Sequence, residues 1–420
     1  MTRPRTRGTD MSEGGGDSTG TVAAGAVEAL GGAARRRGAG IAGFAGAAVG
    51  VVAAGAAVGV AVERLTVGRG MRRKARLALD SAGPYGTLRG TVGTALAEDG
   101  TELHYEVDEP EAPGKGKGFF GRRAEPPLTV VFSHGYCLSQ DSWHFQRAAL
   151  RAAGVRAVFW DQRSHGRSAR GKGQREAGEP VSIDLLGRDL KAVVDAAAPE
   201  GPLVLVGHSM GGMTTMALAA HYPELIAERV VGAAFIGTSS GLMGEVTYGL
   251  PPVGMSLLRR TVLPGAFRLM LTRTELVEKG RRAVAELIGG IIKRYSFGSR
   301  DVDPVVARFA ERMIEATPVD VVAEFYPAFA EHDKVDALAE FAGRPVLVLA
   351  GEKDMVTPSE HSRVIGEALP DAELVIVPGA GHLVMLEVPD LVSGHLARLV
   401  GRRSAGRNGW AQAAHRAAPE

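Results

Sequence analysis

From about residue 91 the chain alternates short apolar, β-branched runs with longer amphipathic stretches. Short apolar runs of this kind are typical of strands buried in a parallel sheet, and the stretches between them are typical of the helices that cover it. Strands are expected at residues 101–107, 128–132, 156–160, 203–206, 230–236, 345–349 and 373–377, and helices at 143–153, 183–198, 210–222, 359–369 and 385–400. The pattern predicts an α/β fold with a mostly parallel sheet covered by helices on both faces.

The alternation is interrupted once, where residues 242–343 read as several helices without a convincing strand. Ligand sites in open parallel sheets lie outside the carboxyl ends of the strands, so a helical insertion that leaves a strand end would cover the site. We therefore expect residues 91–241 and 344–402 to form two parts of one core, and residues 242–343 to form a helical cap. A separate helical domain is the alternative interpretation.

The amino-terminal part of the chain has a different composition. Residues 1–40 contain almost no large apolar side chains and are predicted to be a disordered tail, as are residues 403–420. Residues 41–62 run for 22 positions without a charge, and a helix of that length would cross about 30 Å of hydrocarbon. Nine of the 22 are Ala and five are Gly, so the hydrophobicity is marginal. A transmembrane helix, a signal segment and a low-complexity linker all stay open.

The linker at residues 63–90 is basic, and three arginines also precede the apolar segment. The more basic flank of a membrane span stays in the cytoplasm, so the expectation is a membrane-anchored protein with its catalytic domain on the cytoplasmic side. An exported protein and a soluble cytoplasmic protein are the alternatives.

Charge and cysteine content narrow the class of protein further. The chain has 49 basic and 47 acidic residues, a balance that gives no chain-wide field for nucleic acid. Cys137 is the single cysteine, so it forms no intramolecular disulfide. No zinc-ligand spacing occurs, and the glycine-rich runs lack the strand and helix of a dinucleotide site. We expect no metal, no cofactor and no nucleic-acid partner.

The most informative stretch is LVLVGHSMGGM at residues 203–213, in which a strand runs through G-x-S-x-G into a helix. A serine at such a turn adopts a strained backbone, and Gly207 and Gly211 lack the Cβ atoms that would clash with the strand and the helix. Ser209 is thereby presented as a nucleophile, while the helix that starts at Met210 directs backbone N–H groups toward the reacting centre.

With three further motifs, the chain resembles the α/β-hydrolase family over residues 91–402. The motifs are SHGY at 133–136, DQRSHGRS at 161–168 and GAGH at 379–382. The resemblance is to cap-bearing serine hydrolases, among them esterases, monoacylglycerol lipases and lactone or thioester hydrolases. It implies an α/β-hydrolase fold, with the cap inserted before the strand that bears the acid.

The resemblance also implies a catalytic triad and an oxyanion hole. The nucleophile is Ser209, the base is His382, and the acid is Asp354 in a G-x-x-D-x-x-x-P motif. The oxyanion donors are the backbone N–H groups of Tyr136 and Met210, so side chains matter less there.

Other residues are expected to support these catalytic groups or are rival candidates for the base and the acid. His134 and Gly135 are expected to support the oxyanion loop, with His134 packed beneath it. His165 is the rival base, and the family gives it a structural role. Glu352 is the rival acid, and the position after the strand at 230–236, where some members carry the acid, offers no carboxylate.

These residues predict a serine hydrolase that cleaves carboxylic esters through an acyl-enzyme. The substrate is expected to be a hydrophobic or lipid-derived ester, because the cap carries apolar side chains that could line an acyl pocket. An acyltransferase, a thioester or lactone hydrolase, and a non-catalytic binding protein are the alternatives. The apolar side chains are Met243, Met255, Met270, Leu271, Phe297, Phe325, Tyr326 and Phe329.

Overall fold

The computed structural model describes residues 78–79, 83, 85–110, 126–176, 180–246, 262–277 and 293–401. The tails expected at 1–40 and 403–420, the apolar segment at 41–62 and the first part of the linker at 63–90 lie outside these ranges. Within the described ranges, no helix is both long enough and apolar enough to cross a membrane.

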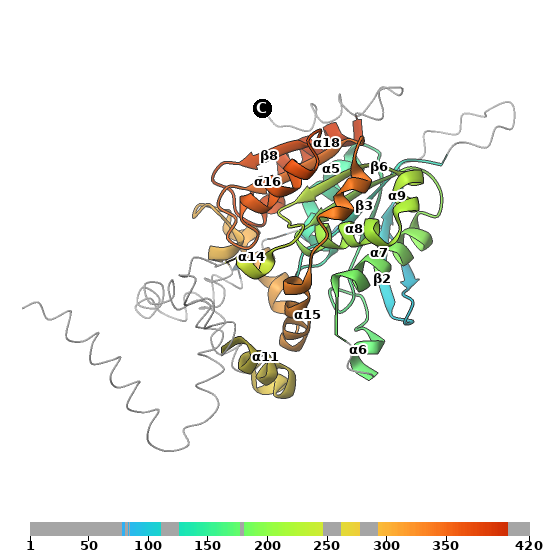
Figure 1. The fold of residues 1–420 in the computed structure, drawn as a ribbon. Coiled ribbons are helices and arrows are strands. Elements are labelled where there is room, and N and C mark those ends of the chain that lie inside the picture. Colours follow the sequence, from blue (N-terminus) through green and yellow to red (C-terminus); the bar gives the residue numbers. More distant parts are fainter. Residues whose placement is uncertain are drawn as a thin grey trace, which may run out of the picture.

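An eight-stranded sheet forms the centre of the molecule (Figure 1), with the order β1-β2-β4-β3-β5-β6-β7-β8. The first two strands run antiparallel to their neighbours, and every later pair is parallel, which confirms the predicted fold class. The strands are β1 Thr91–Leu96, β2 Glu102–Asp108, β3 Thr129–Ser133, β4 Arg156–Trp160, β5 Leu203–His208, β6 Val230–Ile236, β7 Val346–Gly351 and β8 Glu373–Val377.

All seven expected strands are present, with ends displaced by at most two residues, but β1 was not predicted. Its sequence TVGTAL contains no continuous apolar run, because it is an edge strand with one face in solvent. Val92 and Leu96 are 62% and 66% exposed. The apolar-run criterion finds central strands and misses an edge strand of this kind.

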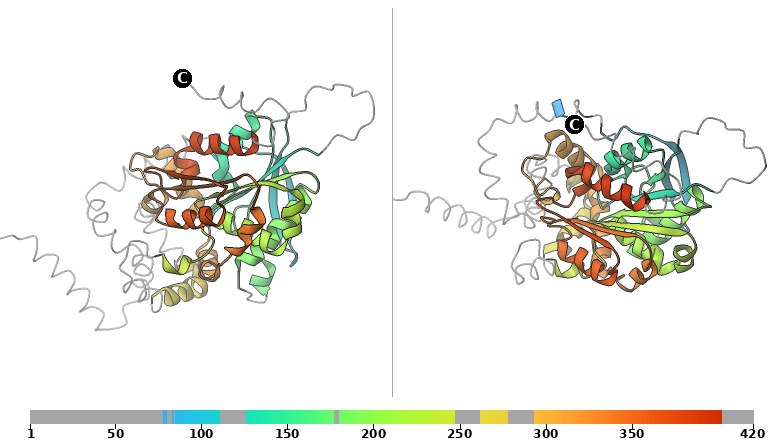
Figure 2. Two further views of the ribbon diagram at one scale, coloured as in Figure 1. Left: turned by 45° about the horizontal axis from the view of Figure 1, so that its top comes forward. Right: turned by 90° about the horizontal axis from the view of Figure 1, so that it is seen from above.

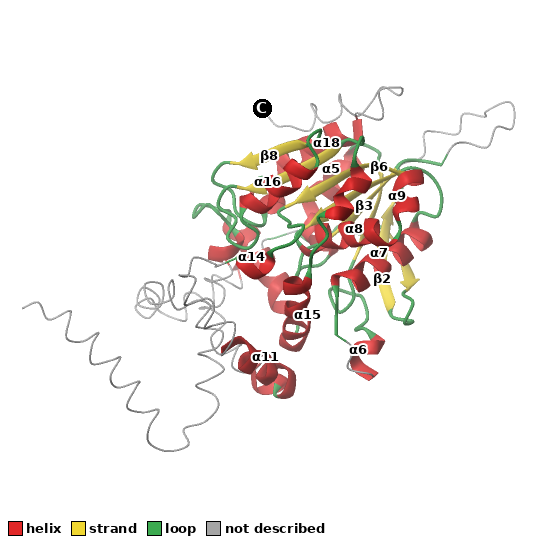
Figure 3. Ribbon diagram, in the orientation of Figure 1, coloured by secondary structure: helices red, strands yellow, loops and turns green. Residues whose placement is uncertain are grey.

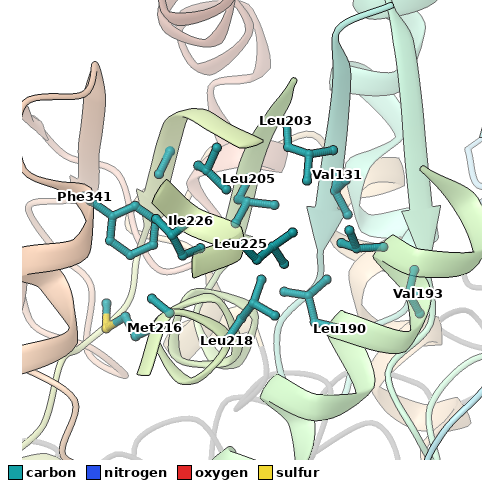
Figure 4. Close-up of a cluster of buried hydrophobic side chains, with 14 of the residues drawn as sticks. Val131, Leu190, Val193, Leu203, Leu205, Met216, Leu218, Leu225, Ile226 and Phe341 are labelled. Atoms are coloured by element: carbon teal, nitrogen blue, oxygen red, sulfur yellow. The ribbon is translucent and has the colours of Figure 1, made fainter. Parts of the chain in front are cut away.

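Helices cover both faces of the sheet (Figures 2 and 3). On one face, Leu190 of α7, Met216 of α8 and Ile365 of α16 share a buried cluster with the strands, part of which is drawn in Figure 4. On the other face, α5 and α18 contribute Leu150 and Leu396 to a second cluster. The helices are α5 His144–Ala152, α6 Lys172–Glu176, α7 Ile183–Ala197, α8 Met210–His221, α9 Pro223–Arg229 and α16 Ser359–Ala368, and the short 3-10 helix η1 spans Gln140–Trp143.

The helix expected at residues 385–400 is two helices, α17 Val384–Glu387 and α18 Pro389–Gly401. Pro389 causes the break, since proline disfavours helical backbone in the residue before it. Val388 accordingly has φ −132° and ψ 63°, and Pro389 opens the next helix.

Between β6 and β7 lie η2 Met243–Glu245, α11 Leu263–Thr272, α14 Pro304–Ala316, α15 Val319–Glu331 and η4 Asp336–Phe341. No strand occurs in the described part of this insertion. Phe309 of α14 and Phe341 of η4 are buried in the two core clusters, so these elements pack on the core itself. In Figure 1, α11 and α15 extend below the sheet, and α15 contacts Tyr136 in the loop after β3.

Candidate active site

Ser209 occupies the sharp turn between β5 and α8. Its backbone has φ 51° and ψ −119°, a strained conformation for a residue with a side chain. A Cβ at Gly207 would lie 2.4 Å from the carbonyl oxygen of Gly211, and a Cβ at Gly211 would lie 2.1 Å from that of Ser133. Glycine is therefore required at both positions. Thr238, just after β6, braces the turn by donating its hydroxyl to the carbonyl of Ser209 at 2.7 Å.

Asp354 and His382, which follow β7 and β8, lie together beside this turn. Nδ1 of His382 is 2.8 Å from Oδ2 of Asp354. Oδ1 of Asp354 accepts the backbone N–H groups of Val356 and Thr357 at 2.8 and 2.9 Å. Because both carboxylate oxygens are acceptors, Nδ1 of His382 carries the proton and Nε2 is left as an acceptor.

Thr357 is a member of this cluster that the sequence did not single out. Its hydroxyl lies 2.8 Å from the carbonyl oxygen of Gly237, 3.0 Å from Oδ2 of Asp354 and 3.3 Å from Nδ1 of His382. In the sequence, only its position three residues after Asp354 could have pointed to a place in this cluster. Gly237, the residue after β6, has φ 49°, and a Cβ there would lie 3.4 Å from Oδ2 of Asp354.

His208 connects the His382 loop to the nucleophile turn, another role that the sequence did not predict. Its Nε2 donates to the carbonyl of His382 at 3.0 Å, and the two ring centroids are 4.8 Å apart. Burial lowers the pKa of His208 well below its ordinary value, with a further contribution from His382, so the ring is neutral. A Cβ at Gly135 would lie 2.6 Å from Nδ1 of His208 and 3.2 Å from Cβ of Ser209. The loop after β3 thus passes directly against Ser209.

The expected oxyanion donors lie on either side of Ser209. Met210 is the first residue of α8, and the first N–H groups of a helix have no partner inside it. Tyr136 follows Gly135 in a tight turn closed by the bond from the N–H of Leu138 to the carbonyl of Gly135 at 3.2 Å. Met210 belongs to the buried cluster that contains Phe325 of α15, and Tyr136 packs against that cluster.

His134 and His165 are buried beneath the oxyanion loop. Nδ1 of His134 lies 2.7 Å from the carbonyl of Gly135, and its Nε2 accepts the N–H of Gln162 at 2.9 Å. Burial lowers the pKa of His134 to about 4. Burial, together with the neighbouring His134, lowers the pKa of His165 to about 3. Within the described part of the chain, neither His134 nor His165 forms a hydrogen bond or a ring contact with His382.

The rival acid Glu352 and the aspartate of the DQRSHGRS motif both have hydrogen-bond partners away from His382. Asp161 accepts the backbone N–H groups of Gln140 and Arg167 at 2.7 and 2.9 Å, which fixes its loop. Glu352 accepts the N–H of Gly379 at 2.9 Å at the protein surface. In the part of the chain that the structure describes, no group of three His, Cys, Asp or Glu side chains could hold a metal ion.

A cavity of about 260 Å³ lies between α11, α15 and η2. None of the described residues that line it has a charged side chain. One wall is Phe329, whose ring lies 5.0 Å from that of Tyr136, so the cavity lies one side chain away from the oxyanion loop. The described lining residues are Met243, Gly244, Leu263, Pro264, Phe267, Tyr326, Pro327, Phe329 and Ala330.

Comparison with known proteins relates this geometry to one family. Residues 129–389 match the model of the alpha/beta hydrolase fold. The chain is 26% identical to an sn-1-specific diacylglycerol lipase of Mus musculus over 64% of this chain and 80% of that protein. It is 27% identical to a non-heme haloperoxidase of Rhodococcus erythropolis over 72% of this chain and 97% of that protein.

Among solved structures, a thermophilic esterase from Thermogutta terrifontis has a similar fold. It is 22% identical, with a TM-score of 0.54, and the match covers 74% of this chain and 98% of the esterase. The family match spans more than half of the chain and includes Ser209, Asp354 and His382. The chain is therefore an enzyme of the alpha/beta hydrolase fold family.

Proposed function

We propose that this enzyme is a serine hydrolase that cleaves carboxylic esters with hydrophobic acyl groups. The observation that carries the proposal is the Asp354–His382 hydrogen bond of 2.8 Å beside a serine held in a strained strand-to-helix turn. Ester hydrolysis in general is the activity that the family and its esterase and lipase relatives support.

In the proposed mechanism, Oγ of Ser209 attacks the carbonyl carbon of the ester and gives its proton to Nε2 of His382. Asp354 stabilises the imidazolium that forms. The negative charge on the tetrahedral oxygen is stabilised by the N–H groups of Met210 and Tyr136, each worth about 10² to 10³ in rate. Collapse expels the alcohol, which takes the proton from His382, and water then releases the acid from Ser209 by the same steps.

The uncharged cavity supports an apolar acyl group as the preferred substrate moiety. Met243, Tyr326 and Phe329, three of the cap residues expected to line an acyl pocket, are part of its wall. Two other residues of that expected set do not line the cavity: Phe297 is buried in a core cluster, and Leu271 is 46% exposed. Met255 lies outside the described residues.

The test is hydrolysis of p-nitrophenyl esters from acetyl to palmitoyl by the full chain, with Ser209→Ala as the blank. Turnover that depends on Ser209 and rises with acyl length beyond acetyl is expected. A preference for the acetyl ester would contradict the acyl-pocket assignment. Absence of Ser209-dependent turnover across the series would contradict the serine hydrolase.

Filling the cavity gives a sharper test of the substrate preference. Ala330→Phe places a ring in the lining, so the chain-length optimum should move to shorter acyl groups while the acetyl ester is affected least. Leu271→Phe on the exposed side of α11 enlarges a cap side chain outside the cavity and is the matched control. An unchanged optimum in Ala330→Phe would assign the acyl group to another surface.

Attachment to a membrane is a separate proposal that rests on residues 41–62 alone, since they form an uncharged run of sufficient length. Carbonate extraction of membranes from cells that express the full chain tests it. Retention of the full chain in the pellet, with release of a chain lacking residues 41–62, is expected. Release of both chains would favour the soluble alternative.

A further inference from the structure

Tyr136 is expected to serve catalysis through its backbone, yet its side chain has contacts of its own with the cap. The hydroxyl donates a hydrogen bond to the backbone carbonyl of Val322 in α15. The ring lies 6.3 Å from that of Phe325 in a stacked arrangement and 5.0 Å from that of Phe329 edge-on. One residue therefore carries both an oxyanion donor and a direct link to a cap helix.

The turn that carries this donor contains a strained residue. Cys137, the next residue, has φ 59°, a conformation that costs energy for a residue with a side chain. The N–H of Leu138 donates to the carbonyl of Gly135 at 3.2 Å and closes the turn. An oxyanion donor must be held within about 0.5 Å of its productive position, so a strained turn of this kind needs support from outside. The Tyr136 side chain supplies that support from α15.

The helix α15 is in turn fixed to the core at a second point. Arg170, in the loop that follows β4, donates to Asp320 at 2.5 Å and also to Glu324. Both carboxylates lie on α15, each two residues away from Val322 along the helix. Besides its buried apolar side chains, α15 is thus held against the core by polar contacts with Arg170 at one point and with Tyr136 at another.

We propose that the Tyr136 hydroxyl is a positioning group that fixes the oxyanion-hole N–H against the cap helix α15. The oxyanion hole is complete only when α15 is seated, and an acyl chain that packs against Phe329 in the cavity reinforces the arrangement. Substrate recognition in the cap is thereby coupled to stabilisation of the transition state. This inference rests on the proposed function of the same site.

The first test is Tyr136→Phe, which removes the hydroxyl and keeps both the ring and the backbone N–H. A misaligned donor should lower kcat by about 10-fold, less than the loss of a whole donor, with KM changed by less than about twofold. Tyr222→Phe, which removes a hydroxyl 3.4 Å from Glu98 at the far end of α8, is the matched control and should retain wild-type kcat.

A second readout separates positioning from a merely structural role. A trifluoromethyl ketone forms a tetrahedral adduct with the nucleophilic serine, and its oxyanion occupies the hole. Tyr136→Phe should weaken inhibition by this ketone by the same factor as it lowers kcat/KM, with an unchanged melting temperature. Inhibition and kcat within twofold of the wild type would overturn the proposal.

A third variant tests the coupling to the cap helix. Arg170→Gln loosens α15 without touching the oxyanion loop, so it should lower kcat in the wild-type background and have little further effect in Tyr136→Phe. Equal losses in both backgrounds would overturn the coupling. A wild-type chain without Ser209-dependent turnover would refute the hydrolase and this inference together, whereas an active wild type with an unaffected Tyr136→Phe refutes only the latter.

Discussion

The substitution Asp354→Asn should invert the tautomer of His382, because the surroundings of the carboxylate dictate how the amide must lie. Oδ1 accepts two backbone N–H groups, at 2.8 and 2.9 Å. An amide NH₂ in that place would face two donors, so the amide oxygen must occupy it. The NH₂ group then takes the place of Oδ2, where Oγ1 of Thr357 at 3.0 Å and Nδ1 of His382 at 2.8 Å are available as acceptors.

With Nδ1 accepting, the proton of the neutral imidazole moves to Nε2. A ring in this tautomer cannot take the proton of Ser209. In a serine protease triad the wrong tautomer lowers kcat by about 10⁴, which corresponds to about 5 kcal/mol of activation free energy. The backbone donors to Oδ1 leave the amide no alternative orientation, so we expect a loss of the same order here.

The assay is kcat for p-nitrophenyl butyrate, combined with ¹⁵N NMR of the imidazole to identify the protonated nitrogen. Glu352→Gln, the same chemical change two residues away at the surface, is the control and should keep the wild-type kcat. A kcat for Asp354→Asn within tenfold of the wild type, or an NMR spectrum with Nδ1 still protonated, would refute the reasoning.

Three further outcomes follow from the packing. Gly211→Ala should prevent folding, because its Cβ would lie 2.1 Å from a backbone oxygen. Gly265→Ala would place its Cβ where no atom lies within 4 Å, so it should stabilise the protein by about 0.4–1 kcal/mol. Equal thermal midpoints for the two variants would contradict this reasoning. Asp189→Ala removes the carboxylate that lies 2.5 Å from the buried Arg163 guanidinium, which keeps Asp99 at 3.0 Å as a partner. The free energy of unfolding in urea should fall by about 3 kcal/mol, the low end for a broken buried pair; a fall below about 1 kcal/mol would contradict this. Burial lowers the pKa of His165 from 6.5 to about 3 in the folded state. Below pH 6.5 the unfolded chain therefore binds a proton that the folded protein does not bind, so the free energy of unfolding is highest above pH 6.5 and falls as the pH falls toward 3. His165→Gln should make this pH dependence less steep.

The central part of the fold was predictable because the parallel strands are buried on both faces. Strands β4 and β6 begin and end where the apolar runs do. Strand β8 does so too, because its sequence is an apolar run although it is a partly buried edge strand. The edge strand β1 has no such signal, since four of its six residues are exposed. The missed break before Pro389 has a different cause: the apolar pattern continues across it, and only the backbone restriction imposed by proline ends the helix.

At the site, the residues whose function depends on a local turn were the predictable ones. Ser209 lies in a pattern of neighbours along the chain, so its strained turn could be inferred from sequence alone. Thr357 and His208 act through contacts with residues distant in sequence, and His208 reaches a carbonyl 174 positions away. Such contacts depend on the final arrangement of three loops, which no local pattern encodes. The same limit hid the bond between Tyr136 and α15.

The closeness of Gly237 to the Asp354 carboxylate bears on how the site could change during evolution. A side chain grown from the end of β6 would begin 3.4 Å from Oδ2, beside the place where His382 needs an acid. Aspartate tolerates a positive φ better than most residues do, so this position could supply the carboxylate itself. A duplicated gene could then pass through an intermediate with both acids before losing the original one. The location of the acid is thus free to drift between two strands without any change in backbone topology.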